Sequence, residues 1–415
     1  MDELAHKADV ASVASCDVAI VASCDVAIVG GCGRVGLPLG LAFADRGLDV
    51  VLVDVSQPAV DRVNNADLPF MESGADHVLK RVIADGKLRA TAEVAAVTAA
   101  RYVVVVIGTP VDEHLNPDPA AISRALVGAL PHLRNGQTII LRSTVYPGVT
   151  RQIERMFADR GLQVDVAFCP ERIAEGRAMV ELFSLPQIVS ARTAEARASA
   201  AELFRRLTDT IVELSPEEAE LAKLFTNTWR YIKFAAANQF YSIANDYGLD
   251  FERIRTALAH DYPRAADLPA AGFAAGPCLF KDTMQLAAFD KNDFVLGHSA
   301  MLINEGLPLY VVDRLERRFD LSTMVVGILG MAFKAESDDT RSSLSYKLKK
   351  ILQFKAKSVL CTDPYVRSDD LVPLDRVLSE CDLLVVGTPH AAYRDLSPSQ
   401  PCADVWNVLG RGVGV

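Results

Sequence analysis

The chain has 415 residues, of which 50% are hydrophobic and 23% charged, and its formal net charge is −10. This length predicts two or three globular domains, and the negative charge argues against nucleic acid or an anionic membrane as the main partner. No apolar run approaches the roughly 20 residues of a membrane span, and the first residues lack the basic segment of a secretory signal. We therefore expect a cytoplasmic protein, in which a polyanionic small molecule can bind where Arg and Lys side chains form a pocket.

The cysteines and histidines show no metal-binding pattern. The eight cysteines contain no C-x-x-C pair, and the seven histidines are scattered without ligand spacing. A chain of this size does not need disulfides to hold its core together. We therefore expect reduced thiols and no metal site.

A duplication marks the beginning of the chain. Residues 13–20 recur unchanged as residues 21–28. Only the second copy runs into the glycine-rich stretch that follows, so only it can form the first strand of a domain. We expect residues 1–22 to be a loosely attached extension, and the repeat by itself reveals no role.

A glycine-rich loop between a strand and a helix opens the first domain. Residues 25–30 form a short apolar run, suited to a strand buried on both faces of a parallel sheet. The loop 31–36 follows, then a helix pattern over residues 37–46 and a second apolar strand over residues 50–53 that ends at Asp54. This order is the dinucleotide-binding fingerprint in its full context.

Each residue type in this fingerprint has a physical reason. Gly31 permits a tight turn, Gly33 lets the backbone approach a pyrophosphate, and Gly36 allows close packing of helix and strand. The pyrophosphate would rest on the helix N-terminus. Asp54 would accept hydrogen bonds from the adenosine ribose and repel a 2′-phosphate, so we expect NAD rather than NADP as the cofactor.

The alternation of strands and helices continues to residue 214. Apolar runs over residues 102–107, 138–141 and 164–168 predict three more buried strands. Ligands of open α/β sheets bind beyond the carboxyl ends of the strands, and the polar residues at these ends are Thr109, Thr144, Glu171 and Glu175. Each could singly be an ordinary loop residue or helix cap, but their clustering at one sheet edge favours a functional role. We assign residues 23–214 to an NAD-binding domain.

A long helix follows the first domain. Ser215 as N-cap and Glu218 closing a capping box predict where it begins, and the helical pattern runs on to Gly248. A helix of this length is unusual in a globular domain, so we expect it to span the molecule, join two domains and offer a dimer surface. Lys223 and Asn227 are four residues apart and share one face; their apolar flanks favour a partly buried functional pair over a solvated stripe.

The central helical domain, residues 215–319, also contains Cys278 within a run of Gly, Ala and Pro. Small residues around a cysteine let a bulky substrate approach its sulfur. We expect a helix to follow, capped by Asp282 with Gln285 in a capping box. The helix N-terminus and Lys281 would lower the pKa of the thiol and favour the nucleophilic thiolate. The alternative is that Cys278 is a small buried apolar residue.

A smaller α/β unit, residues 320–415, ends the chain. It lacks a G-x-G-x-x-G segment, so we assign it no second dinucleotide. Its expected strands cover residues 323–329, 358–361 and 382–386, and its expected helix covers residues 347–352. The loop 330–341 contains Lys334 and Arg341, which would be phosphate ligands or, alternatively, ordinary surface charges.

These segments together resemble the nucleotide-sugar 6-dehydrogenases, the family of UDP-glucose, GDP-mannose and UDP-N-acetylmannosamine dehydrogenases. The resemblance covers nearly the whole chain beyond residue 22, in the family's order, and the Cys-x-x-Lys-Asp segment is its most specific part. The matching stretches are residues 31–36, 108–110, 143–148, 170–176, 218–227, 276–282 and 330–341, with Asp363 and Pro364.

The resemblance implies an α/β fold in which an N-terminal Rossmann-type NAD domain and a C-terminal Rossmann-like domain are joined by the long central helix. It implies a homodimer or higher homo-oligomer that oxidises the C6 alcohol of a nucleotide sugar to a carboxylate with two NAD per turnover. The route would pass through a thiohemiacetal and a thioester on Cys278. A thiol suits this route because it adds reversibly to an aldehyde and its thioester hydrolyses readily.

The resemblance also implies roles for individual residues. Lys223 would act as base or oxyanion stabiliser in the alcohol step, Asn227 would hydrogen-bond the C6 oxygen, and Asp282 would activate water together with Lys223. Glu171, assisted by Thr144, resembles the family's base for thioester hydrolysis. The NAD site would be formed by Gly31, Gly33, Arg34, Val35, Gly36, Asp54, Thr109, Thr144, Glu175, Lys281 and Arg341. The substrate site would be formed by Glu171, Lys223, Asn227, Phe273, Gly276, Phe333, Lys334 and, from a neighbouring subunit, Arg264.

The identity of the sugar rests on conflicting signals. Lys281 resembles the glucose and GDP-mannose branches, whereas residues 169–173 resemble the N-acetylhexosamine branch, and Ala275 with Pro277 departs from the family's usual glycine pair before the cysteine. We expect UDP- or dTDP-glucose, with UDP-N-acetylmannosamine or another hexosamine as the alternative. Two other classes stay open: a two-electron dehydrogenase of the hydroxyacid type, which needs no thiol, and a non-catalytic NAD or nucleotide sensor.

Overall fold

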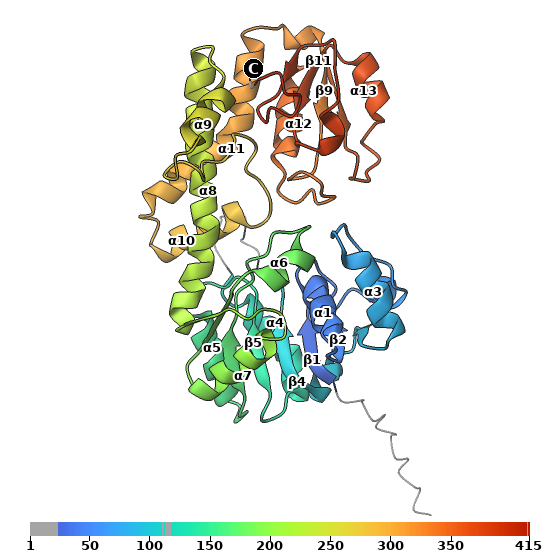
Figure 1. The fold of residues 1–415 in the computed structure, drawn as a ribbon, viewed down its shortest axis with the longest axis vertical. Coiled ribbons are helices and arrows are strands. Elements are labelled where there is room, and N and C mark those ends of the chain that lie inside the picture. The colour runs from blue at the N-terminus through green and yellow to red at the C-terminus, as the bar shows by residue number, and fades with distance from the viewer. Residues whose placement is uncertain (1–23, 110–111, 113–117, 413) are drawn as a thin grey trace, which may run out of the picture.

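The computed structural model describes residues 24–109, 112, 118–412 and 414–415. They form two α/β units at opposite ends of the molecule, with helices beside and between them (Figure 1). The expected extension at residues 1–22 and Pro110 of the expected loop 108–110 lie outside the described residues.

The first unit is built on an eight-stranded sheet with the order β3-β2-β1-β4-β5-β6-β7-β8. Its strands are β1 (Cys24–Val29), β2 (Val50–Val53), β3 (Leu88–Thr91), β4 (Ala100–Val105), β5 (Thr138–Leu141), β6 (Asp165–Phe168), β7 (Gln187–Ala191) and β8 (Ile211–Leu214). Neighbours pair in parallel except for β6 and β7, which are antiparallel. The strand order changes direction between β1 and β4, and such a switch point leaves a ligand crevice at the carboxyl ends of these strands.

Helices pack on both faces of this sheet. They are α1 (Gly36–Asp45), α2 (Gln57–Asn64), α3 (Ala75–Ala84), α4 (Ala121–Ala129), α5 (Val149–Ala158), α6 (Ala178–Ser184) and α7 (Ala194–Phe204), with 3-10 helices η1 (Val94–Ala99) and η2 (Leu130–His132). Successive residues of β1 enter different cores: Ile28 packs in the cluster of α1 and α3, and Ala27 in that of α4 and α5. This is why the strands are apolar throughout rather than alternating.

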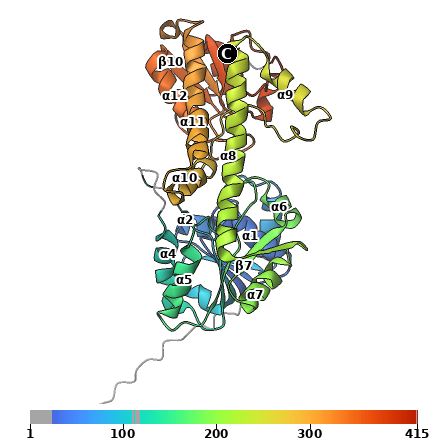
Figure 2. The ribbon, with the colours of Figure 1, turned by 90° about the vertical axis from the view of Figure 1, so that its left-hand side faces the viewer.

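The helix α8 (Pro216–Asp246) is 31 residues long and runs from the first unit along the second (Figures 1 and 2). The Ser215 hydroxyl accepts from the Glu218 N–H and the Glu218 carboxylate accepts from the Ser215 N–H, so the predicted capping box is confirmed. The other central helices are α9 (Phe251–Ala259), α10 (Leu279–Phe289) and α11 (Val295–Glu316). Both α10 and α11 pack against α8, which places the start of α10 near the junction of the two units.

The second unit contains a four-stranded parallel sheet with the order β10-β9-β11-β12. Its elements are η3 (Leu321–Thr323), β9 (Val325–Leu329), α12 (Leu344–Lys355), β10 (Ser358–Thr362), α13 (Leu374–Glu380), β11 (Leu383–Val386), η4 (Ala391–Tyr393) and β12 (Cys402–Ala403). Tyr241 of α8 and Val311 of α11 share one buried cluster with Val326 and Ile328 of β9. The two long helices are therefore part of this unit's core.

The predicted α/β architecture with a long central helix is confirmed, but the predicted start of the helix after Cys278 is wrong. The helix α10 begins at Leu279 with Cys278 as its N-cap residue, and Asp282 lies inside the first turn and is fully buried. Gly276, whose φ is +102°, and Pro277 lie directly before the N-cap residue, where the loop ends and the helix begins. Asp282 therefore does not cap the helix, and its side chain lies in the protein interior. Among the described helices, none is both long and apolar enough to cross a bilayer.

Candidate active site

The glycine loop after β1 combines tight packing with open space. A Cβ on Gly31 would lie 2.7 Å from the Leu52 Cβ, and one on Gly36 would lie 2.5 Å from the Gly30 carbonyl oxygen. At Gly33 the nearest atom would be 3.7 Å away. Packing therefore requires Gly31 and Gly36, whereas Gly33 leaves room for a ligand to approach the backbone.

The surroundings of this loop fit a dinucleotide. The Asp54 carboxylate accepts from the N–H groups of Cys32 at 3.0 Å and Ser56 at 3.1 Å, which holds it beside the loop. Val35 is the N-cap residue of α1 and supplies no side-chain hydrogen bond to the first turn. Within this turn, the N–H groups of Leu37 and Leu39 donate to the carbonyl oxygens of Gly33 and Val35, and Pro38 has none. A pyrophosphate would therefore meet the start of α1 at Gly36 and the glycine loop before it, and Asp54 lies where an adenosine ribose would follow.

The ends of β4 and β5 are attached to the start of α10. The Thr109 hydroxyl donates to the Thr144 carbonyl oxygen at 2.7 Å. The Lys281 Nζ donates to both the carbonyl and the hydroxyl oxygen of Thr109, each at 3.2 Å. These contacts bring three predicted NAD-site residues together and place Cys278, three residues before Lys281, beside the crevice of the first unit.

Glu171 lies in the loop after β6, where its carboxylate meets a buried arginine. The Arg142 Nε donates to the Glu171 Oε2 at 2.8 Å, and the Arg142 side chain is 1% exposed. The sequence analysis missed Arg142. Arg142 directly follows β5 and precedes Ser143 and Thr144, and this position at a strand end could have indicated a functional role.

Helices α8 and α10 bring the predicted catalytic side chains together. Lys223, Asn227 and Asp282 are all buried, as the apolar flanks of the first two predicted. The Asn227 Nδ2 donates to the Asp282 Oδ2 at 2.5 Å. The Asp282 Oδ1 lies 3.1 Å from the Lys281 Nζ and has no hydrogen-bond partner among the described residues. The Asp282 carboxylate therefore lies between the Asn227 amide of α8 and the Lys281 ammonium of α10.

The Cys278 thiol differs from its prediction. Its side chain reaches solvent, but protein atoms surround most of it. This desolvation, together with the Asp282 carboxylate, raises the pKa of the thiol above its ordinary value, while Lys223 and Lys281 act in the opposite direction. The predicted lowering of the pKa is therefore wrong, because the effect of burial exceeds that of the two cations.

A network of ion pairs links the two units. Arg34 of the glycine loop contacts Glu175 and Asp338, each at 2.8 Å. Lys334 donates to the Glu175 carbonyl oxygen, and Arg341 lies 3.6 Å from the Glu175 carboxylate. Four predicted ligand-site residues, Arg34, Glu175, Lys334 and Arg341, therefore meet at the junction.

The pKa values of Glu175 and Asp339, the two acids at the centre of this network, are shifted in opposite directions. Burial and the neighbouring Asp339 raise the pKa of Glu175 to about 7, against the opposing effects of Arg34, Arg341 and Lys334. Burial by itself would also raise the pKa of Asp339, but hydrogen bonds from Arg341 bring it below its ordinary value. Arg341 thus pairs mainly with Asp339, at 2.6 Å.

The substrate loop, residues 330–341, is fixed from beneath by a buried pair that the sequence analysis did not single out as functional. The Asp363 Oδ2 accepts from the N–H groups of Met331 at 2.7 Å and Ala332 at 3.0 Å. The fully buried His390 lies 3.1 Å from Asp363 through Nε2, and its Nδ1 accepts from the Glu336 N–H. Although burial opposes it, these hydrogen bonds lower the pKa of Asp363 to about 2.

The substrate loop also touches the cysteine loop. A Cβ on Gly276 would lie 2.6 Å from the Phe333 ring, and the Gly276 N–H donates to the Ser342 carbonyl oxygen at 3.3 Å. The two segments therefore pack closely against each other.

Two predicted substrate residues are not brought into this group. The Phe273 side chain is 2% exposed and packs its ring 6.4 Å from that of Trp406 in the core of the second unit. Arg264 lies in the exposed loop after α9 and donates to the Tyr262 hydroxyl at 3.2 Å. The predicted contact of Arg264 with a neighbouring subunit stays a prediction.

Arg230 is a further cation that the sequence analysis missed. It follows Asn227 by three residues on α8, so the two share a face. It is exposed, and no hydrogen bond or ion pair joins it to any other residue that the structure describes. The pKa of Lys334 is lowered by burial and, to a smaller extent, by the charge of Arg230. The charge of Arg230 is therefore close enough to Lys334 to affect its pKa.

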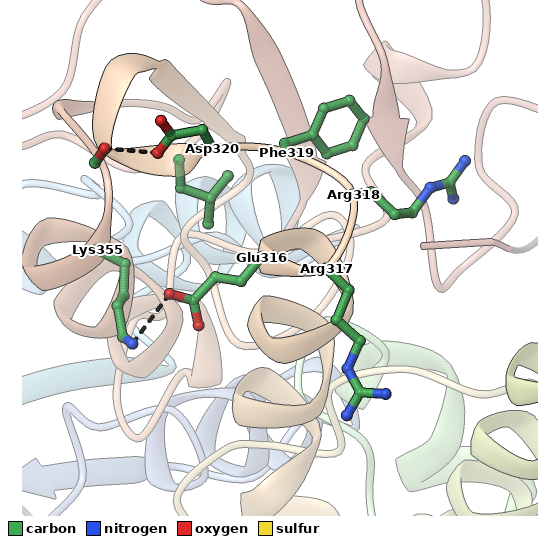
Figure 3. A pocket seen from close by; sticks show the side chains of 8 residues that line it. Glu316, Arg317, Arg318, Phe319, Asp320 and Lys355 are labelled. Carbon is green, nitrogen blue, oxygen red and sulfur yellow. Dashed lines mark hydrogen bonds and ion pairs between the residues drawn. The ribbon is translucent and has the colours of Figure 1, made fainter.

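A shallow hollow lies elsewhere, at the C-terminal end of α11 (Figure 3). Its lining includes Arg317, Arg318 and an ion pair between Glu316 and Lys355 at 3.0 Å. None of the predicted site residues lines it. In the described part of the chain, no group of three or more His, Cys, Asp or Glu side chains could hold a metal ion.

Comparisons with known proteins agree with this geometry. Residues 24–208 match the NAD binding domain of the UDP-glucose/GDP-mannose dehydrogenase family, residues 217–305 its central domain and residues 327–411 its UDP binding domain. The UDP-N-acetyl-D-mannosamine dehydrogenase of Pyrococcus horikoshii is 30% identical over 394 residues, which cover 92% of this chain and 91% of that protein. The enzyme of the same name from Yersinia pestis is 28% identical over 413 residues, covering 92% and 97%.

Solved structures of similar proteins extend over both units. The structure of the UDP-D-ManNAc dehydrogenase from Pyrococcus horikoshii has a TM-score of 0.84 at 29% identity and covers 94% of this chain and 93% of that one. That of a UDP-glucose dehydrogenase from Pyrobaculum islandicum has a TM-score of 0.87 at 24% identity, with 96% and 98% covered. The second similarity concerns the fold alone.

Proposed function

Because this chain belongs to the UDP-glucose/GDP-mannose dehydrogenase family, we propose that it oxidises the C6 alcohol of a UDP-N-acetylhexosamine, such as UDP-N-acetylmannosamine, to the carboxylate. The family assigns it as an NAD-dependent nucleotide-sugar dehydrogenase, an oxidoreductase that acts on a CH–OH group. The proposal adds the sugar, the four-electron course and the residues that carry it.

The single observation that supports this chemistry best is the meeting of α8 and α10. Asn227 donates to one oxygen of Asp282, and the other oxygen lies 3.1 Å from the Lys281 Nζ. Cys278 begins the same helix as Asp282, and Lys223 is close enough to affect the pKa of its thiol. A base, an amide donor, a carboxylate and a thiol therefore lie together.

These residues divide the reaction among them. The glycine loop and Asp54 would hold NAD, which would supply the hydride acceptor for both oxidations. Lys223 takes the proton of the C6 alcohol in the first, and Asn227 donates a hydrogen bond to its oxygen. The Cys278 sulfur adds to the resulting aldehyde to form a thiohemiacetal, which becomes a thioester on losing the second hydride. Asp282 accepts a proton from the water that hydrolyses this thioester.

The choice of sugar departs from our expectation of UDP- or dTDP-glucose. The curated relatives above are UDP-N-acetyl-D-mannosamine dehydrogenases, which favours the hexosamine alternative. The exposed Arg230, whose charge affects the pKa of Lys334 and which has no ion pair among the described residues, supports it. A guanidinium placed there could donate to the carbonyl oxygen of an N-acetyl group.

A homodimer through α8 is part of the proposal. Large apolar side chains line the exposed side of this helix and are unusual on the surface of a monomer. They are Phe225, Trp229, Phe240, Ile243 and Tyr247, with exposed fractions of 53%, 56%, 49%, 52% and 80%. The cytoplasmic location stays a prediction from the sequence.

The test is the number of NADH molecules formed per sugar consumed. With UDP-N-acetylmannosamine, wild type should form two, and Cys278→Ser should stop before the acid is released. UDP-glucose and dTDP-glucose serve as competing substrates. One NADH per sugar, unaffected by Cys278→Ser, would indicate an ordinary two-electron dehydrogenase. No NADH with any nucleotide sugar would favour a sensor.

A further inference from the structure

Glu220 of α8 is a buried acid that has no part in the reaction proposed above. It is 1% exposed, and among the described residues no Lys, Arg or His forms an ion pair with it. A carboxylate in the protein interior is costly unless hydrogen bonds or a cation compensate its charge. The donors that surround Glu220 therefore indicate why this position holds an acid.

These donors all lie at the start of α5. The Glu220 Oε2 accepts from the Gly148 N–H at 2.7 Å. The Oε1 accepts from the Thr150 N–H at 2.8 Å and from the Thr150 hydroxyl at 2.6 Å. Gly148 is the N-cap residue of α5 and has no side chain with which to cap the helix. Glu220 therefore caps α5 from another helix, where the positive end of the helix dipole also favours its charge.

Glu220 thereby fixes one end of the segment that contains Thr144. Residues 142–148, which we call the Thr144 loop, connect β5 to α5. Near the other end of this loop, the Thr144 carbonyl oxygen accepts from the Thr109 hydroxyl at 2.7 Å, and Lys281 of α10 donates to Thr109. These three residues are among those expected at the NAD site. The Thr144 loop is therefore attached to α8 through Glu220 and to α10 through Thr109.

The acid also lies on the helix that supplies the predicted catalytic side chains. Lys223 follows Glu220 by three residues, so the two share one face of α8, and both are buried. Asn227 of the same helix donates to Asp282 of α10. The contact of α8 with the Thr144 loop and its contact with α10 therefore lie within about two helical turns of each other. A shift of the loop along α8 would change its place relative to Lys223.

We propose that Glu220 is a positioning residue, which holds the Thr144 loop of the NAD site in a fixed place on the helix α8. It transfers no proton and touches neither substrate nor cofactor. The inference rests on the function proposed above, which places Thr144 at the NAD site and Lys223 at the C6 alcohol. Without the Glu220 carboxylate the loop can shift, so NAD binds less tightly, while the nucleotide-sugar site at the loop 330–341 stays intact.

Calorimetric titration of the full-length protein with NAD and, separately, with UDP tests this role without turnover. In Glu220→Gln the amide oxygen can keep both Thr150 bonds, but the amide NH2 then faces the Gly148 N–H, a second donor. NAD binding should weaken about tenfold, the equivalent of one charge-assisted hydrogen bond, and UDP binding should stay unchanged. The matched control is Glu217→Gln. It removes a charge three residues earlier, from a side chain that is 38% exposed and pairs with Arg151 of α5, and both affinities should stay unchanged.

A second pair of variants keeps the acid and changes one of its donors. Thr150→Val removes the hydroxyl that donates to Glu220 at nearly constant shape, and it should also weaken NAD binding. Thr150→Ser keeps the hydroxyl and should retain the NAD affinity of the wild type. If Glu220→Gln does not fold, this pair decides alone. During turnover, the KM for NAD should rise in Glu220→Gln, while the KM for the nucleotide sugar should not.

Two results would overturn the proposal. One is an unchanged NAD affinity in both Glu220→Gln and Thr150→Val. The other is a parallel loss of NAD and UDP binding, which would indicate a general effect on folding. Asp54→Ala should weaken NAD binding in either case, so it separates a failure of the positioning role from a failure of the NAD site. One NADH per sugar would refute the four-electron reaction, while the NAD affinities would still decide the role of Glu220.

Discussion

Replacing Glu175 by Gln should make the stability of the protein less dependent on pH near neutrality. Burial and the nearby Asp339 raise the pKa of Glu175 from 4.5 to about 7. A carboxyl group whose pKa is raised on folding stabilises the protein fully below its unfolded-state pKa. This stabilisation is lost as the pH rises through the folded-state pKa. The stabilisation by Glu175 is therefore lost between about pH 4.5 and about pH 7.

The magnitude follows from the same two values. At about 1.4 kcal/mol per pH unit, the difference between 4.5 and about 7 amounts to about 3 kcal/mol in total. About 2 kcal/mol of this should be lost between pH 5.5 and pH 8, the range in which the assay is practical. The Glu175 side chain is 17% exposed, so screening by solvent reduces this figure only modestly.

Thermal unfolding of the ligand-free protein measures the effect. The midpoint of Glu175→Gln relative to wild type should rise by a few degrees between pH 5.5 and pH 8, since about 1 kcal/mol moves a domain midpoint by about 2–4 °C. Glu213→Gln removes the same charge at an exposed position of the same unit and reports the general effect of net charge. If the two variants change by the same amount within about 1 °C, the raised pKa of Glu175 does not contribute to folding and the reasoning fails.

Three further outcomes can be measured directly. Gly276→Ala would place a methyl group 2.6 Å from the Phe333 ring at a φ of +102°, so the KM for the nucleotide sugar should rise at least about tenfold. Gly306→Ala is the control, because a Cβ at Gly306 would have no atom within 4 Å, and it should leave KM unchanged. An unchanged KM in Gly276→Ala as well would contradict the close packing of Gly276 and Phe333. Asp54→Ala should lower the preference for NAD over NADP, measured as a ratio of kcat/KM, at least about tenfold. Because the pKa of Cys278 is raised, its alkylation by iodoacetamide should still accelerate above about pH 9; a plateau below about pH 8 would contradict the raised pKa.

The parts that the sequence predicted well are those set by local rules. The β1–α1–β2 segment follows from an apolar strand, three glycines and an acid at fixed spacing. The capping box at Ser215 could be predicted because both of its residues, Ser215 and Glu218, lie within four positions of the sequence. The burial of Lys223 and Asn227 followed from their apolar neighbours on one helix face.

The parts that it missed depend on partners far apart in the chain. Arg142 and Glu171 are 29 residues apart, and Asp363 and His390 are 27 apart, so no window of sequence shows either pair. The direction of the Cys278 pKa was misjudged for a related reason. Its nearest cation and its helix position were visible, whereas the protein that desolvates the thiol comes from other segments.

Lys334 and Arg341 both have protein partners that the sequence did not reveal. The sequence predicted them as phosphate ligands or, alternatively, as ordinary surface charges. In the structure, Lys334 donates to the Glu175 carbonyl oxygen and Arg341 pairs with Asp339. A diphosphate that engages them must compete with these contacts, and part of its binding energy is spent in replacing them. The same exchange would loosen the pairs that join Arg34 of the glycine loop to the second unit through Glu175. We therefore expect binding at the nucleotide-sugar site and binding at the dinucleotide loop to be coupled through Glu175, whose pKa is raised to about 7.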